Sequence, residues 1–233
     1  MFGEKNTAIA IIAIVLLSSV SLHVWMNNDE DDEMKELSLE NFGRASDFTL
    51  SDLNEDNVTF SDYTGKVRLV TFIYTACTQG CSTITLRMLN MLTTLNQAHQ
   101  NDVEFFVIDF DYMHDNVTTL QKYSEILAGE NGVPSNMNFM WTGDKDHINQ
   151  TTNDWDFFFE LQSSPMMNMT TDMDMTDTST TTDDTSAHEG HEIVWLHPFI
   201  IYLVDQEDNL RKKVWGLDWE QNQVINLFEQ LLE

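Results

Sequence analysis

Residues 67–92 read VRLVTFIYTACTQGCSTITLRMLNML, and this stretch decides the fold class. Its first part, Val67 to Thr75, is a continuous apolar run with β-branched and aromatic members, which is typical of a central strand buried on both faces. The apolar residues that follow recur at helical spacing, at positions 84, 86, 88, 89, 91, 92 and 95. The stretch therefore predicts a buried strand that runs directly into a helix.

The rest of the chain repeats this alternation of strand and helix. A hairpin is expected from Phe48 to Lys66, where short apolar runs flank an Asn/Asp cluster. Further strands are expected at 103–110, 138–143, 198–205 and 210–216, and further helices at 116–128, 146–162 and 218–233. Strands that alternate with helices, followed by a terminal hairpin and helix, predict an α/β sheet covered by helices.

The N-terminal region carries a long apolar run from Thr7 to Met26. A bilayer core takes about 20 residues of helix, so this run is long enough to span it. Lys5 precedes the run and an acidic stretch follows it, which places the N-terminus in the cytoplasm. A cleaved signal peptide is the alternative, although no small-x-small cleavage site follows the run.

We therefore expect an uncleaved single-pass anchor in the cell membrane and an extracytoplasmic C-terminal domain. The expected parts are a cytoplasmic N-terminus at 1–6, a transmembrane helix at 7–26, an acidic tether at 27–41 and a folded domain at 42–233. Export would place the thiols of the domain where they can be oxidised.

The charge balance excludes one large class of partners. The chain has 39 Asp and Glu against 11 Lys and Arg, a net charge of −28 at pH 7. Nucleic-acid binding requires basic residues to neutralise phosphates, so no nucleic-acid partner is expected. The acidity suits solvation in high salt, and the alternative is a field that steers cations or a basic partner.

Cys77 and Cys81 are the only cysteines, and they lie where the predicted strand turns into the helix. On a helical turn this spacing puts both side chains on one face with Cβ atoms about 5–6 Å apart. A disulfide needs about 3.5–4.5 Å, and so short a loop gains little from a structural bridge. A helix N-terminus stabilises thiolate, the reactive and metal-binding form. The pattern favours a redox pair or a metal site over a structural disulfide.

A metal site of this kind needs a ligand from elsewhere in the chain. Soft thiolates favour Cu(I), zinc and iron–sulfur centres, and two sulfurs are too few for a structural zinc site. His197 directly precedes the predicted strand at 198–205 and is the candidate. The alternative is that His197 has only a structural role.

Four segments together resemble the Sco/SenC family in their order and spacing. They are GKVRLVTFIYTACTQGC at 65–81, VIDFDYMHD at 107–115, FMWTG at 139–143 and HPFIIYLVDQEDNLRKKVWG at 197–216. Members of this family are membrane-anchored, thioredoxin-like copper proteins associated with cytochrome c oxidase assembly. The resemblance covers residues 42–233 apart from an insertion, and it implies a thioredoxin-like sheet flanked by helices.

The resemblance also implies a copper site. It assigns Cys77, Cys81 and His197 as ligands of Cu(I) or Cu(II), a donor set that soft-ligand chemistry also supports. It further matches Asp111 and Asp115 to an acidic loop near the site, where one of them would orient His197 or neutralise charge. The alternative for these two carboxylates is a solvated loop in a very acidic protein.

The chain departs from the family pattern around the motif. Thr78 and Ser82 stand where the family has a proline after each cysteine, which leaves the redox potential open. Pro198 follows His197 where the family commonly has serine, and the bond before it is one that can be cis. His114 takes a position that is often basic in the family.

The leading functional hypothesis is a copper metallochaperone, which requires no enzymatic turnover. It would deliver copper to the binuclear copper site of cytochrome c oxidase subunit II, or to another copper-accepting client, outside the membrane. The alternative is a membrane-anchored thiol–disulfide oxidoreductase that reduces client cysteines through the pair Cys77 and Cys81. A copper or redox sensor is a third hypothesis.

Residues 163–192 do not follow the strand–helix pattern, and they predict a disordered insertion rich in Thr, Asp and Met. Thioethers are soft Cu(I) ligands, so this segment is a candidate auxiliary copper-capture site. Its candidate ligands are Met166, Met167, Met169, Met173, Met175, His188 and His191. The alternative is an acidic loop in which the Met enrichment is incidental.

Overall fold

The computed structural model describes residues 37–162 and 194–233. The chain divides into two compact units, Met1–Leu37 and Ser38–Glu233. All the helices and strands described below belong to the second unit.

Two expectations fall on residues outside this description. They are the transmembrane anchor at 7–26 and the insertion at 163–192. Among the helices of the described ranges, none has both the length and the apolar character needed to cross a membrane.

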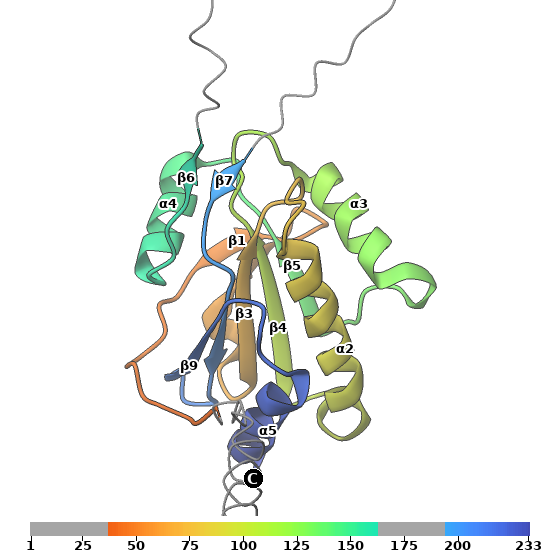
Figure 1. The fold of residues 1–233 in the computed structure, drawn as a ribbon, viewed down its shortest axis with the longest axis vertical. Coiled ribbons are helices and arrows are strands. Elements are labelled where there is room, and N and C mark those ends of the chain that lie inside the picture. Colours follow the sequence, from red (N-terminus) through yellow and green to blue (C-terminus); the bar gives the residue numbers. More distant parts are fainter. Residues whose placement is uncertain (1–36, 163–193) are drawn as a thin grey trace, which may run out of the picture. The chain divides into compact units, whose positions relative to one another are not determined.

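A five-stranded sheet with the order β5-β4-β3-β8-β9 forms the centre of the fold (Figure 1). Its strands are β3 (Val67–Ile73), β4 (Val103–Asp109), β5 (Met137–Met140), β8 (Ile200–Val204) and β9 (Leu210–Trp215). β4 pairs with β3 in parallel and β8 pairs with it antiparallel, so β3 is the middle strand. All seven residues of β3 are buried, which confirms the prediction of a central strand covered on both faces.

Helices flank this sheet. They are α2 (Cys81–His99), α3 (Val117–Ala128), α4 (Lys145–Asp154) and α5 (Gln221–Leu232). α2 packs on β4 and α5 packs on β3, with the ring of Phe228 in α5 at 5.4 Å from that of Phe105 in β4. Phe106 points to the opposite face, because side chains alternate along a strand, and it packs there against Phe48 and Phe60. This mixed α/β arrangement is consistent with a thioredoxin-like fold.

Short elements complete the two faces. The predicted hairpin is present as β1 (Thr49–Ser51) and β2 (Asn57–Thr59), which pair antiparallel. Two 3₁₀ turns are η1 (Phe60–Tyr63) and η2 (Gly129–Asn131). A two-stranded ribbon joins β6 (Glu160–Leu161) to β7 (Trp195–Leu196), and β7 ends directly before His197.

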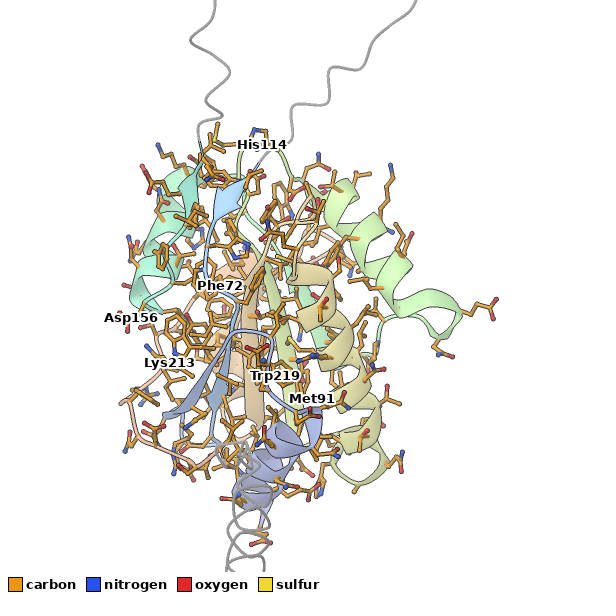
Figure 2. All side chains as sticks on the ribbon, in the orientation of Figure 1. Phe72, Met91, His114, Asp156, Lys213 and Trp219 are labelled. Atoms are coloured by element: carbon orange, nitrogen blue, oxygen red, sulfur yellow. The ribbon has the colours of Figure 1, made fainter. Side chains whose placement is uncertain are left out.

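The helix expected at 146–162 is wrong in its second half, because α4 ends at Asp154. Trp155 and Phe157 are buried against Phe72 of the central strand, whereas Phe158 is exposed. The helix ends because the chain turns at Trp155 and Asp156, where Asp156 has a left-handed φ of 55°. Figure 2 shows Phe72 inside the fold and Asp156 at its surface, where it pairs with Lys213 at 2.8 Å.

A buried ion pair fixes β3 to the turn between β8 and β9. Arg68 is fully buried, and its guanidinium donates to the Asp208 carboxylate at 2.7 Å and to the Asp205 carbonyl at 2.8 Å. Burial by itself would raise the pKa of Asp208, but the hydrogen bonds from Arg68 and Thr64 outweigh it and lower that pKa. The pair is therefore charged in the folded protein at neutral pH.

Substitution of Asp208 by Asn should destabilise the fold, because the buried charge of Arg68 loses its partner while Asn still suits the positive φ of 69° at this position. We expect a loss of about 3 kcal/mol in the free energy of unfolding, measured by denaturant titration at pH 7. The double variant Arg68→Met, Asp208→Asn should recover most of the lost stability, because no unpaired charge is left buried.

The pKa of Asp208 is lower in the folded protein than in the unfolded chain. The stability that the ion pair contributes should therefore be lost as the pH falls through the folded pKa of Asp208. A single variant as stable as the parent protein would contradict this account.

Candidate metal centre

The two cysteines lie at the junction between the central strand and α2. Cys77 is in the loop that follows β3, and Cys81 is the first residue of α2. Gly80 precedes that helix, and a Cβ atom there would lie 2.6 Å from two ring carbons of Phe199. Only glycine lets the loop approach this ring so closely, so Gly80 brings the cysteine loop against the segment that carries His197.

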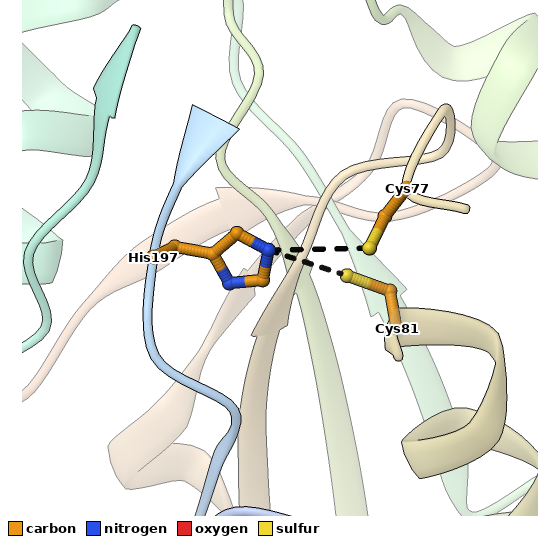
Figure 3. A group of neighbouring side chains, drawn as sticks. All are labelled: Cys77, Cys81 and His197. Atoms are coloured by element: carbon orange, nitrogen blue, oxygen red, sulfur yellow. Dashed lines mark hydrogen bonds between the residues drawn. The ribbon is translucent and has the colours of Figure 1, made fainter. Parts of the chain in front are cut away.

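His197 completes a group of three ligand atoms (Figure 3). Its Nε2 atom lies 4.0 Å from Sγ of Cys77 and 3.9 Å from Sγ of Cys81. All three atoms lie within 4.8 Å of one another. In residues 37–162 and 194–233, this is the only group of three or more His, Cys, Asp or Glu side chains that could hold a metal ion.

The backbone selects the tautomer of His197. Its Nδ1 atom lies 3.0 Å from the carbonyl oxygen of Pro198. A carbonyl oxygen only accepts hydrogen bonds, so Nδ1 carries the proton and donates it. The lone pair of Nε2 is then left facing the two sulfurs, which is the arrangement of a metal-binding imidazole.

Four aromatic rings surround the imidazole of His197. Their centroids lie 5.0 Å from it for Phe199, 5.3 Å for Phe110, 5.4 Å for Tyr74 and 6.1 Å for Phe157. The rings fix the orientation of the imidazole by packing, and they shield part of it from water. Pairing between the imidazole and the thiol groups is therefore stronger than it would be in solvent.

The two thiols have opposite protonation tendencies. The hydrogen bond from the Cys81 thiol is the largest influence on Cys77, and together with the backbone N–H groups of Gly80 and Cys81 it outweighs burial and lowers the Cys77 pKa to about 3. Burial and the charge of Cys77 raise the pKa of Cys81 well above its ordinary value. Both thiols are free, so the site holds one thiolate and one thiol at neutral pH.

This donor set fits copper by its chemistry and its spacing. Two sulfurs and one imidazole nitrogen are soft ligands of the kind that select Cu(I). Bonds of about 2.3 Å to sulfur and about 2.0 Å to nitrogen, as on zinc, give a sulfur–nitrogen edge of about 3.7 Å in a trigonal site. The observed 3.9 and 4.0 Å are close to that edge, so the three side chains need little movement to share one ion.

Asp111 and Asp115 lie on the loop after β4, but neither forms a hydrogen bond with His197. Asp115 accepts hydrogen bonds from the backbone N–H of Thr75, at 2.8 Å, and from the hydroxyl of Thr75. Asp111 is buried and accepts from Nδ1 of His114 at 2.9 Å. Nδ1 of His197 pairs with the carbonyl of Pro198 and not with these carboxylates, and the expectation that one of them neutralises charge near the site stays a prediction. Asp115 instead holds the loop that leads to Cys77.

Two further sequence expectations can be placed. The described residues contain no cis peptide bond, so the bond before Pro198 is trans. His114 lies at the outer end of the fold (Figure 2), on the loop after β4, where its ring bonds to Asp111. The seven candidate auxiliary ligands, Met166, Met167, Met169, Met173, Met175, His188 and His191, lie outside the described residues.

Sequence reasoning did not identify the aromatic rings around His197 or the role of Gly80. Tyr74 and Phe199 lie within the motif segments, where their apolar character predicts only strand residues. Phe110 and Phe157 reach the site through tertiary packing that no local pattern reports. A fully buried carboxyl group at Asp109, near the end of β4, was also missed.

Comparison with known proteins bears on both the fold and the site. The family model described as SCO1/SenC matches residues 38–233. A search of curated proteins finds no match.

Solved structures share the fold. A SCO1/SenC family lipoprotein from Bacillus anthracis has a TM-score of 0.61 at 19% identity, over 84% of this chain and 98% of that one. Copper-bound ScoI of Arabidopsis thaliana has a TM-score of 0.61 at 14% identity, over 82% and 98%. BsSco, a Sco-family cytochrome c oxidase assembly protein in which a disulfide switch was identified, has a TM-score of 0.56 at 17% identity, over 82% and 95%.

The protonation of the two thiols predicts how metal affinity depends on pH. Cys77 is already a thiolate, so only Cys81 has to lose a proton when both sulfurs bind Cu(I). We expect one proton released per Cu(I) at pH 7.5, and about a tenfold rise in affinity per pH unit between pH 7 and 9. Anaerobic competition titrations against a Cu(I) chelator, corrected for the chelator's own protonation, measure both quantities. Release of two protons would contradict the assignment of Cys77 as a thiolate.

Proposed function

The chain belongs to the SCO1/SenC family, and on that premise we propose that it is a copper metallochaperone. It holds copper on Cys77, Cys81 and His197 and passes it to a client protein. The observation that carries this proposal is the convergence of three soft ligand atoms from distant parts of the chain. Copper is bound in the Arabidopsis thaliana structure that shares this fold, which supports the choice of metal.

The geometry also supports a route for release of the copper. Cys77 is the more accessible sulfur, with 6% of the residue exposed against 1% for Cys81, and His197 is partly exposed. An incoming ligand of the client would therefore replace Cys77 or His197 first. The raised pKa of Cys81 favours the return of its proton once the copper has left.

We further propose the binuclear copper site of cytochrome c oxidase subunit II as the acceptor, on the outer side of the membrane. BsSco, which shares the fold, is a member of a family of cytochrome c oxidase assembly proteins. The apolar run at 7–26 would anchor the chain on that side with its N-terminus in the cytoplasm. Copper transfer in vitro to a purified soluble domain of such a subunit tests this choice of client.

Thiol–disulfide exchange is the second candidate function, and the low pKa of Cys77 favours it. A thiolate with a neighbouring thiol can attack a client disulfide, and the second thiol then resolves the mixed disulfide. His197 separates the two functions. It would be a ligand in copper binding, whereas exchange needs only the two sulfurs.

Substitution of His197 by Ala should weaken Cu(I) binding more than the 10- to 100-fold that is typical when an outer partner of a ligand is lost. Exchange with a model disulfide should continue, because both cysteines remain. His114→Ala is the matched control, since this imidazole bonds to Asp111 and not to the site, and it should bind Cu(I) like the parent protein. The metallochaperone proposal fails if the parent protein holds no Cu(I) against a competing chelator, or if loss of His197 leaves the affinity unchanged.

We also propose that the Met-containing segment at 163–192 captures copper before it reaches the main site. The segment joins β6 to β7, and β7 ends one residue before His197, so captured copper would enter beside the site. Its five methionines supply soft thioether ligands.

Replacement of the five methionines at 166, 167, 169, 173 and 175 by serine should lower the number of Cu(I) ions bound to about one, because the auxiliary thioethers are lost. The affinity of the remaining site should not change. Replacement of threonines at 180, 181 and 182 by serine is the control, and stoichiometric titration of the full-length chain is the measurement. A parent protein that binds a single Cu(I), with the same capture rate as the variant, would rule out an auxiliary site.

A further inference from the structure

Asp109 is a buried carboxyl group that the proposed copper chemistry does not use. It is the last residue of β4 and lies opposite Ile73 of β3, two positions before Thr75. Only 3% of the residue is exposed. Its Oδ1 atom accepts the backbone N–H of Asp111 at 3.0 Å, whereas no donor in the described part of the chain reaches its Oδ2 atom.

Asp115 is the neighbouring carboxyl group that interacts with the Asp109 side chain, by its charge and by a side-chain hydrogen bond. Both of its oxygens already accept hydrogen bonds from Thr75, one from the backbone N–H and one from the hydroxyl. A charged Asp109 beside Asp115 would set two carboxylate groups against each other at a part-buried position, with repulsion and no donor for Oδ2 of Asp109.

A proton on Oδ2 of Asp109 removes this conflict. The neutral acid has one O–H donor, and Asp115 is the acceptor beside it. The pKa of Asp109 is raised well above its ordinary value, first by burial and then by the charge of Asp115. Two other titratable groups interact with Asp109. The charge of Asp111 raises the pKa of Asp109 while its backbone N–H lowers it, and a charged Asp109 would raise the pKa of Cys81 on α2.

We propose that Asp109 is a positioning residue, which as a neutral acid donates its Oδ2–H to Asp115 and so holds Asp115 on Thr75. We call the hydrogen-bonded chain Asp109–Asp115–Thr75 the clamp. Thr75 leads into the loop that carries Cys77, so the clamp fixes Sγ of Cys77 relative to His197. The inference deepens the proposed function, on which its copper-binding readout rests. The two other readouts, the protonation of Asp109 and the reactivity of Cys77, can be measured whether or not the protein binds copper.

Infrared spectroscopy of the full-length, metal-free chain tests the protonation directly. A neutral carboxylic acid absorbs at a higher carbonyl frequency than a carboxylate. We expect such a band at pH 7, absent from Asp109→Asn and retained in Asp111→Asn, the matched control on the same loop. Absence of the band from the parent protein, or its survival in Asp109→Asn, would overturn the inference.

Two substitutions of Asp109 test the clamp. Asp109→Asn keeps a donor that can reach Asp115, so it should bind Cu(I) and react with an alkylating reagent at Cys77 like the parent protein. Asp109→Ala removes the donor, so we expect Cu(I) affinity to fall about tenfold, as for loss of other partners that orient a ligand, and the alkylation rate to change. Thr75→Val removes the hydroxyl from the same clamp, so it should also lower the Cu(I) affinity and change the alkylation rate. This variant provides the test if Asp109→Ala does not fold.

The outcomes separate this inference from the proposed function. If the parent protein binds no Cu(I), the proposed function fails, while the infrared band and the alkylation rates still decide the role of Asp109. If Asp109→Ala and Thr75→Val both match the parent protein in affinity and alkylation rate, the clamp does not position Cys77. The inference is equally wrong if Asp109→Asn is as impaired as Asp109→Ala, because a neutral donor would then not be what the site requires.

Discussion

The close approach of Gly80 to the ring of Phe199 is the contact on which the site depends. It lets the loop between β3 and α2 lie against the segment that follows β7, although these parts are more than a hundred residues apart in the chain. The approach leaves no room for a side chain at Gly80. With the loop in this place, one imidazole nitrogen lies near both sulfurs, and the three ligand atoms are within 4.8 Å of one another.

Burial and neighbouring charges give chemically similar groups at the site different protonation states. Of the two thiols, Cys77 is held as a thiolate and Cys81 as a thiol, because a buried pair does not accommodate two charges side by side. Burial likewise raises the pKa of Asp109, and the charge of the neighbouring Asp115 adds to this effect. In so acidic a chain, each additional negative charge near the site raises the free-energy cost of ionising the neighbouring groups.

Local patterns predicted the order of strands and helices, because burial of β3 and the helical spacing in α2 are visible in the sequence itself. They also placed Cys77 and Cys81 at the junction. The helix at 146–162 was predicted too long, since Trp155 and Phe157 leave α4 to pack on Phe72, a tertiary preference that overrides local spacing. The rings around His197 and the partners of Asp115 arise from contacts between distant segments, so no sequence pattern could reveal them.

The central claim is that Cys77, Cys81 and His197 bind one copper ion together. X-ray absorption spectroscopy at the copper edge, on the full-length chain loaded with one equivalent of Cu(I), tests it most directly. The account predicts two sulfur ligands and one nitrogen ligand with the outer-shell scattering of an imidazole, and loss of that nitrogen when His197 is replaced by Ala. A copper ion surrounded by sulfur alone, or a spectrum that does not change in this variant, would contradict it.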